Sequence, residues 1–163
     1  MWIMNKYREL SEELIKNYDI NKFPKKIYLT RRNVKTRRIL NEYELMKVLS
    51  KFGYEMISPE EYSLQEQFCM FYNADKIISI LGSGLTNLVC SKETISILGI
   101  VPSIRLEDTY KYITNSIGGK YFEYIENNKK NYVYQNSYNK GNDFDFYISI
   151  NDFKSVLDEF ERC

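Results

Sequence analysis

Apolar residues in the first half of the chain switch between the spacing of strands and the spacing of helices. Residues 26–30 (KIYLT) and 54–57 (YEMI) are short runs typical of strands, and Ile27 and Leu29 fall on the same side of the first run. A segment with apolar residues every three or four positions follows each run. The pattern therefore predicts the order strand, helix, strand, helix.

The two predicted helices begin with residues suited to capping. Asn41 is followed three positions later by Glu44, and Ser63 by Glu66, which is the pattern of a capping box. Gly53 is suited to end the first helix because glycine readily takes the left-handed conformation. The expected buried faces are Leu45, Val48, Leu49 and Phe52 in the first helix, and Leu64, Phe68, Phe71 and Tyr72 in the second.

Two further runs, 76–81 (KIISIL) and 95–101 (ISILGIV), are almost continuously apolar. Such runs are typical of parallel strands that are covered on both faces. The segment between them contains a glycine turn that enters a short helix. Together these patterns predict an α/β fold, a Rossmann-like three-layer domain with a mainly parallel sheet.

The flanking segments predict further elements around this core. A surface helix through about Tyr18 is expected, with an apolar face formed by Ile3, Tyr7, Leu10, Leu14 and Tyr18. The next expected elements are a helix at 106–117 stopped by Gly118 and Gly119 and a strand at 121–125. Residues 127–143 are expected to form an exposed loop or an edge strand at 132–134, followed by a strand at 144–150 and a last helix capped by Asn151.

The length of 163 residues, or 19.5 kDa, corresponds to one ordinary domain. We expect a single Rossmann-like domain over 1–163, with an N-terminal helix and linker at 1–24, a core at 25–125, and a loop, edge strand and C-terminal helix at 126–163. The 23 Lys and Arg nearly balance the 22 Asp and Glu, so bulk charge indicates no particular partner.

The absence of histidine and the small number of cysteines exclude several kinds of catalytic and metal site. The sequence has no histidine, which excludes Ser-His-Asp catalysis, Cys-His catalysis and histidine-ligated zinc. Cys69, Cys90 and Cys163 lack CxxC spacing, which indicates reduced thiols and no cysteine metal site. No stretch approaches 18 apolar residues, and the first residues do not form the apolar core of a signal peptide. We therefore expect a soluble, cytoplasmic protein without a bound metal.

A basic segment between residues 20 and 41 stands out from this neutral background. Residues 20–41 contain no Asp or Glu and eight cations, which are Lys22, Lys25, Lys26, Arg31, Arg32, Lys35, Arg37 and Arg38. Arginines that follow a parallel strand lie at the carboxyl edge of the sheet, where a guanidinium can bind a phosphate through two hydrogen bonds. The segment is thus either an anion-binding loop or a solvated surface loop.

The segment 81–87 (LGSGLTN) is a second candidate for anion binding. Its glycines allow a phosphate to approach the backbone, and the N–H groups at a helix start favour an anion. Ser83, Thr86 and Asn87 add neutral donors. The alternative is that Gly82 and Gly84 only make a tight strand-to-helix turn.

Separated segments of the chain together resemble glycosyltransferase family 61. Members of that family commonly carry a Ser-Arg-Arg segment, an Arg-x-x-Asn-Glu segment, a glutamine-containing helix and a His-Gly-Ala-Gly-Leu-Thr-Asn loop. This chain has Thr-Arg-Arg at 30–32, Arg-Ile-Leu-Asn-Glu at 38–42, Gln67 in its third expected helix, and LGSGLTN at 81–87. Order and spacing agree over about residues 25–125, which makes the resemblance specific.

The resemblance, which extends to capsular polysaccharide, EGF-domain and xylan-type glycosyltransferases, implies a fold and an activity. It implies transfer of a sugar, with inversion, from a nucleotide sugar that is usually UDP-linked to a glycan or polysaccharide acceptor. The family enzymes are GT-B-like pairs of Rossmann-type domains that require no metal or other cofactor. This chain matches their C-terminal, donor-binding domain, so we expect little transfer without a separate N-terminal half or a homodimer partner.

The family motifs also imply donor-binding residues. These are Arg31, Arg32, Arg38, Asn41, Glu42, Gln67, Gly82, Ser83, Gly84, Thr86 and Asn87. The arginines and the N–H groups of 82–84 would neutralise the diphosphate leaving group. Asn41 is equally explained as a helix cap, Glu42 as a first-turn acid, and Gln67 as a partner of a backbone group. No catalytic residue is assigned.

Two departures from the family pattern and one alternative function remain. Leu81 stands where the family has a histidine, and Ser83 where it has an alanine. Loss of the imidazole bears on donor contact and on turnover. The alternative is a noncatalytic module that binds a nucleotide, or that binds nucleic acid through Lys25, Lys26 and the arginines.

Overall fold

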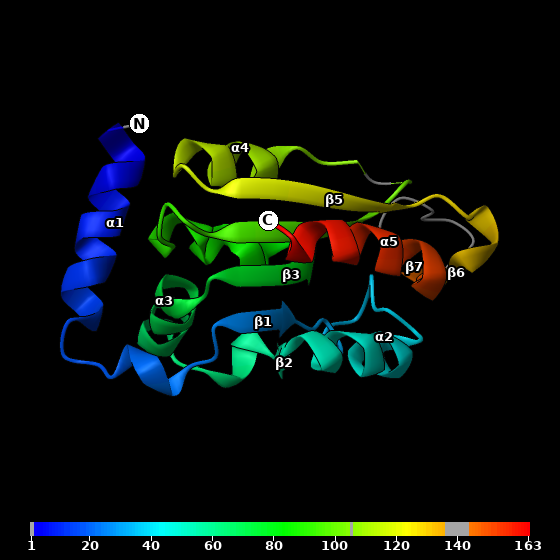
Figure 1. The fold of residues 1–163 in the computed structure, drawn as a ribbon, viewed down its shortest axis with the longest axis horizontal. Coiled ribbons are helices and arrows are strands. Elements are labelled where there is room, and N and C mark those ends of the chain that lie inside the picture. The colour runs from blue at the N-terminus through cyan, green and yellow to red at the C-terminus, as the bar shows by residue number, and fades with distance from the viewer. Residues whose placement is uncertain (1, 105, 136–143) are drawn as a thin grey trace.

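Five parallel strands form the central sheet of the computed structural model, which describes residues 2–104, 106–135 and 144–163 (Figure 1). The order across the sheet is β2-β1-β3-β4-β5, and every neighbouring pair is parallel. The strands are β1 (Lys26–Leu29), β2 (Glu55–Ile57), β3 (Lys76–Ile80), β4 (Ser96–Pro102) and β5 (Lys120–Glu126). The prediction of an α/β, Rossmann-like domain with a parallel sheet is confirmed.

Helices cover both faces of the sheet, which gives three layers (Figure 1). The helices are α1 (Trp2–Ile15), α2 (Glu42–Leu49), α3 (Leu64–Asn73), α4 (Thr109–Ser116), α5 (Ile150–Glu161) and a 3₁₀ helix at Ser83–Cys90. In β1, Ile27 and Leu29 face the core beneath α3, the 3₁₀ helix and α4, whereas Tyr28 faces the core beneath α2 and α5. The alternation predicted for this strand is therefore confirmed.

A second, two-stranded antiparallel sheet lies beyond the carboxyl ends of the main strands (Figure 1). It pairs β6 (Tyr132–Tyr134) with β7 (Phe144–Phe146), and residues 136–143 of the expected loop lie outside the described residues. The strand expected at 132–134 is confirmed as β6, whereas the strand expected at 144–150 is corrected because β7 ends at Phe146. The hairpin forms because the Tyr132 ring packs on Phe144 and Phe146, with centroids 5.6 and 6.0 Å apart, and buries all three.

Helix α1 forms as predicted, but its expected apolar face is wrong. Tyr7, Leu10 and Leu14 are 56, 56 and 52% exposed, while Ser11 and Ile15 are buried. Arg8 explains the orientation because it donates to the carboxylate of Glu93 (2.9 Å) and to the carbonyl of Ile117 (3.0 Å). Helix α1 thus packs against α3 and the 3₁₀ helix, with Ser11 beside Cys90 and Ile15 in the core. The side chain of Ile3 lies outside the described part of the chain.

The predicted capping signals have mixed outcomes. Ser63 and Glu66 form the expected capping box at α3, and Gly53 has a left-handed φ of 82° after α2. The predicted capping box at α2 does not form, because the Asn41 side chain makes no hydrogen bond to the backbone at the start of the helix. Its amide instead donates to the carbonyl of Ile148 (3.0 Å) and accepts from the N–H of Ile148 (2.9 Å). The cap of α5 is Ser149 and not Asn151, because the helix starts two residues earlier than expected. Leu64, expected on the buried face of α3, is 57% exposed.

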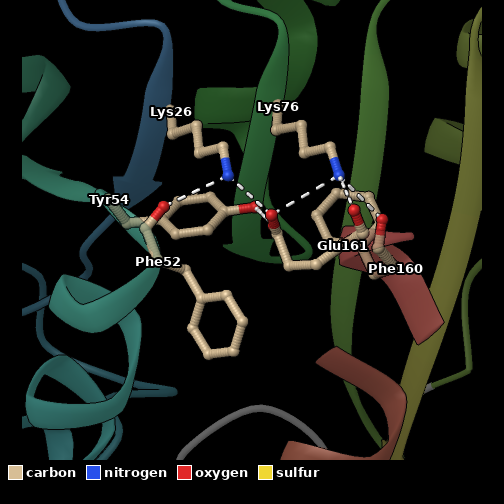
Figure 2. Close-up of polar contacts among 6 residues, drawn as sticks. All are labelled: Lys26, Phe52, Tyr54, Lys76, Phe160 and Glu161. Carbon is tan, nitrogen blue, oxygen red and sulfur yellow. Dashed lines mark hydrogen bonds and ion pairs between the residues drawn. The ribbon is translucent and has the colours of Figure 1, made fainter. Parts of the chain in front are cut away.

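The amino ends of the strands are tied to the end of α5 (Figure 2). The Glu161 carboxylate accepts from Lys26 (2.6 Å) and from the Tyr54 hydroxyl (2.5 Å) and lies 3.6 Å from Lys76. Burial raises the pKa of Glu161, but the hydrogen bonds from Lys26 and Tyr54 outweigh it and hold the pKa below its usual value. These two lysines therefore serve the fold at the amino edge.

Candidate functional site

The strand order locates the place where ligands usually bind in this kind of sheet. The chain runs outward from β1 to β2, returns past β1 to β3, and then continues outward on the other side. In open α/β sheets, ligands bind at the carboxyl ends of the two strands where this reversal occurs. A cavity of about 500 Å³ lies at the ends of β1 and β3, within the size range of small-molecule sites.

Two loops line most of this cavity. The arginine loop (residues 30–41) follows β1, and the glycine loop (residues 81–87) follows β3. The lining residues are Leu29, Thr30, Arg31, Asn33, Val34, Pro59, Glu60, Gln67, Ser79, Ile80, Gly82, Ser83, Gly84 and Asn87. Six of the sequence-predicted site residues are among them: Arg31, Gln67, Gly82, Ser83, Gly84 and Asn87. The structure therefore brings the two predicted anion-binding segments together.

Arg31 and Gly82 form the closest approach between the loops. A Cβ built on Gly82 would lie 2.5 Å from Nη1 of Arg31 and 4.0 Å from Nη2 of Arg37. Gly82 has an extended backbone (φ 174°), so the need for glycine here is the space taken by the guanidinium. A cation thus rests directly on the backbone of the glycine loop, where an anion would meet both.

Arg37 is a site residue that sequence reasoning placed only in the general basic segment. Its φ is 59°, a left-handed conformation that is rare for residues other than glycine. Its side chain crosses to the glycine loop and donates from Nη1 to the carbonyl of Leu81 (3.0 Å). The Leu81 side chain itself is buried in the core and does not line the cavity. Arg37 therefore fastens the arginine loop to the glycine loop.

Gln67 and Asn87, which both line the cavity, form a hydrogen-bonded pair. Gln67 accepts from the Asn87 amide (2.9 Å) through Oε1 and donates to the Tyr62 carbonyl (3.1 Å) through Nε2. The backbone partner expected for Gln67 is thus present, together with a contact to a second predicted residue. This arrangement fixes the Asn87 amide at the cavity.

Glu42 serves to hold the start of the arginine loop. Its carboxylate accepts from the hydroxyls of Tyr28 (2.7 Å) and Thr30 (2.5 Å), and Thr30 in turn accepts from the Arg32 N–H (3.1 Å). Burial, and then the adjacent carboxylate, raises the pKa of Tyr28 well above its usual value, which keeps this hydroxyl a donor. Glu42 therefore holds Thr30, and Thr30 holds the backbone of Arg32, at the point where the arginine loop begins.

Arg38 and Asn41 both bind the segment around β7. Arg38 donates from its backbone N–H, Nε and Nη2 to the carboxylate of Asp145 (2.8, 3.1 and 2.5 Å). Burial raises the pKa of Asp145, but the hydrogen bonds from Arg38 outweigh it and keep the pKa below its usual value. Asn41 is held by the backbone of Ile148.

Five predicted site residues therefore lie outside the main cavity. Arg32, Arg38 and Glu42 line a separate hollow of about 240 Å³, together with Ile39 and Leu40. Thr86 is exposed on the 3₁₀ helix, and Asn41 faces Ile148. Conversely, Pro59 and Glu60 line the main cavity and were not predicted. The signal that identifies them is their position just after β2, at the same carboxyl edge of the sheet.

The basic segment divides between the two edges of the sheet. Lys25 donates to the backbone and side chain of Asn73 (3.0 and 2.7 Å), and Lys26 binds Glu161 at the amino edge. The arginines lie at the carboxyl edge, where Arg31 lines the main cavity and Arg32 and Arg38 line the separate hollow. Lys25 and Lys26, which the nucleic-acid alternative requires, are therefore held by contacts within the fold.

The comparisons identify the family of the chain. Within the described residues, no helix has the length and apolar content required to cross a membrane. No curated protein matches the sequence significantly. The sequence profile of glycosyltransferase 61 matches residues 3–98, more than half of the chain, and this range contains both loops of the cavity. The chain therefore belongs to glycosyltransferase family 61, which implies a sugar donor and an acceptor as its substrates.

Proposed function

We propose that the main cavity binds the diphosphate of a nucleotide sugar, with a UDP-sugar as the donor, for inverting transfer to a glycan or polysaccharide such as a capsule. The observation that carries this proposal is the meeting of the Arg31 guanidinium with the backbone of Gly82 at the switch point of the sheet. A diphosphate leaving group needs cations and N–H donors, and these two groups supply both.

We propose further that the leaving group is stabilised without a metal. Among residues 2–104, 106–135 and 144–163, no three His, Cys, Asp or Glu side chains gather where they could hold a metal ion. The guanidinium of Arg31 and the donors of Ser83 and Asn87 at the cavity are the chain's own groups for this role.

The acceptor, in this proposal, enters with a second domain, partner chain or second copy. The family architecture implied by the resemblance places the reaction between two Rossmann-type domains, and the described residues form one such sheet. Holding donor and acceptor together accounts for about 7–11 kcal/mol of barrier reduction. We therefore expect the chain by itself to bind the donor with little transfer.

Leu81 favours a second candidate, a nucleotide-binding protein without transferase activity. The family histidine would stand at this position, but the Leu81 side chain is buried in the core. Incubation with UDP-sugars and glycan acceptors, alone and with candidate partner chains, separates the two: release of UDP with glycosylated product supports the transferase, and nucleotide binding without any product under all conditions supports the second candidate.

The test of the site itself is the affinity for UDP of Arg31→Ala. Loss of a charge-assisted hydrogen bond to a phosphate is expected to cost about 1.5–3 kcal/mol, or about one to two decades in Kd. Calorimetry with UDP measures it. Lys51→Ala, which removes an exposed cation near the opposite edge of the sheet, is the charge-matched control and should bind like the wild type. Equal affinities for Arg31→Ala and the wild type would refute the site.

A further inference from the structure

Residues 37–40, in the second half of the arginine loop, are paired with the strand β7. The Arg37 N–H donates to the Phe144 carbonyl (2.5 Å), the Phe146 N–H donates to the Arg38 carbonyl (3.0 Å), and the Leu40 N–H donates to the Phe146 carbonyl (2.8 Å). Ile39 and Phe146 form a parallel bridge at the centre of this pairing. The loop that carries the cavity cations is therefore held as a strand by the hairpin.

Asp145 lies at the middle of this pairing and is almost completely buried. Its side chain is 4% exposed and accepts three hydrogen bonds from Arg38 and one from Gln135 (2.9 Å). Gln135 also donates to the carbonyl of Lys35 (2.8 Å). The Asp145 carboxylate thus fixes the arginine loop at Arg38 directly and at Lys35 through Gln135.

The residue between those two points is held in a strained conformation. Arg37 has a left-handed φ of 59°, and such a conformation persists where the surrounding contacts determine it. Those contacts are the Phe144 carbonyl on its backbone and the Leu81 carbonyl on its guanidinium. Release of the loop from β7 would let this side chain leave the glycine loop.

We propose that Asp145 is a positioning residue for the donor cavity, and that Arg38 acts through Asp145 instead of contacting the diphosphate. The inference rests on the proposed function. The Asp145–Arg38 pair sets the path of the arginine loop, and that path places Arg37 and Arg31 against Gly82. Asp145 lies outside the matched range of residues 3–98, so a segment beyond that range completes the site.

The two roles of Arg38 make opposite predictions for Asp145→Asn. If Asp145 positions the loop, Asp145→Asn weakens UDP binding by about ten-fold, because loss of its direct contact with Arg38 releases the loop that carries the cavity cations. If Arg38 is itself a phosphate ligand, removal of its competing carboxylate leaves binding unchanged or makes it tighter. Removal of a negative charge near the cavity also favours binding of the anionic UDP, so weaker binding in Asp145→Asn cannot arise from the change in charge alone.

Calorimetry with UDP on a set of variants decides between these roles. Arg38→Lys keeps the charge but loses two-pronged hydrogen bonding, so both roles predict weaker binding for this single variant, and the comparison that separates them is made in the Asp145→Asn background. Positioning through Asp145 predicts that Arg38→Lys costs little more affinity once Asp145 is replaced, whereas direct phosphate contact predicts the same loss in both backgrounds. The double variant Arg38→Lys with Asp145→Asn is expected to bind no more weakly than the weaker single variant. Asp158→Asn, on the exposed side of α5, is the charge-matched control.

Amide hydrogen exchange supplies a readout that does not depend on UDP. In Asp145→Asn, the amides of residues 36–40 are expected to exchange faster, while those of β3 and β4 keep their wild-type rates. Unchanged exchange at 36–40, or wild-type UDP affinity in Asp145→Asn while Arg31→Ala is weakened, overturns the positioning role alone. Failure of the wild-type protein to bind UDP overturns the proposed function and, with it, the donor-site role of Asp145.

Discussion

Gly82 determines how closely the glycine loop approaches the arginine loop. A Cβ at this position would lie 2.5 Å from the Arg31 guanidinium, which is the far end of a flexible side chain and can move aside. Gly82→Ala is therefore expected to cost less than about 1 kcal/mol of stability, because the extended backbone tolerates any residue, while the displaced guanidinium weakens UDP binding.

Thermal unfolding and UDP calorimetry together check this prediction. Gly84→Ala is the comparison, because a Cβ there meets only the Pro59 Cγ at 4.0 Å, an ordinary contact. Gly82→Ala should weaken UDP binding more than Gly84→Ala does. The same loss in both variants would show that the space over Gly82 is not what matters.

The site residues differ in how far their positions follow from local sequence. Arg31 and Gly82 were both predicted to bind an anion, because each follows a predicted parallel strand, and the structure places them side by side. Arg37 and Asp145 were not predicted as site residues. The role of Arg37 depends on its left-handed backbone, and that of Asp145 on its contact with Arg38, from which it is 107 residues away in the sequence. No local pattern encodes such a distant contact.

At the scale of elements, α1 offers a test of which face packs on the domain. Ile15 is 4% exposed, whereas the adjacent Leu14 is 52% exposed. Ile15→Ala is expected to lower the free energy of unfolding by about 2–4 kcal/mol, and Leu14→Ala to change it by less than about 0.5 kcal/mol. Urea unfolding measures both. A larger loss in Leu14→Ala would mean that the apolar face read from the sequence is the packed one.

The elements that sequence patterns predict best are those of the central sheet. The runs at 76–81 and 95–101 are apolar because both faces of β3 and β4 are covered, so composition alone identifies them. The face of α1 was mispredicted because Arg8 binds Glu93 and Ile117, and this overrides the apolar pattern. Periodicity reports which residues can pack, and tertiary polar contacts select among them.

At the scale of the whole molecule, the two edges of the sheet divide the chain's cations by role. At the amino edge, Lys26 and Lys76 are bound by Glu161 (Figure 2). At the carboxyl edge, Arg31 lines the cavity. The basic segment seen in the sequence crosses β1 and so contributes to both edges, which is why charge counting alone could not separate stability from function.

The absence of histidine gives the whole molecule a simple dependence of stability on pH. Side chains with ordinary pKa values near 6.5 are missing, so the free energy of unfolding should be nearly constant between about pH 5.5 and 7.5. Glu161, Glu126, Glu66 and Asp145 all have pKa values lowered in the fold. A carboxylate of this kind stabilises the fold above its unfolded pKa of about 4 and loses that contribution as pH falls through its folded pKa.

Glu161→Gln isolates one part of this dependence. At pH 7 the variant loses a charge partner of Lys26 and Lys76 and is expected to be less stable by about 1.5–3 kcal/mol. The difference from the wild type should shrink as pH falls through the lowered pKa of Glu161, because protonation of the wild-type carboxylate then removes the same charge. Urea unfolding at pH 7 and at a series of acidic pH values, with Glu159→Gln on the exposed side of α5 as control, measures it. A destabilisation that stays constant over the whole series would assign the role of Glu161 to packing and not to its charge.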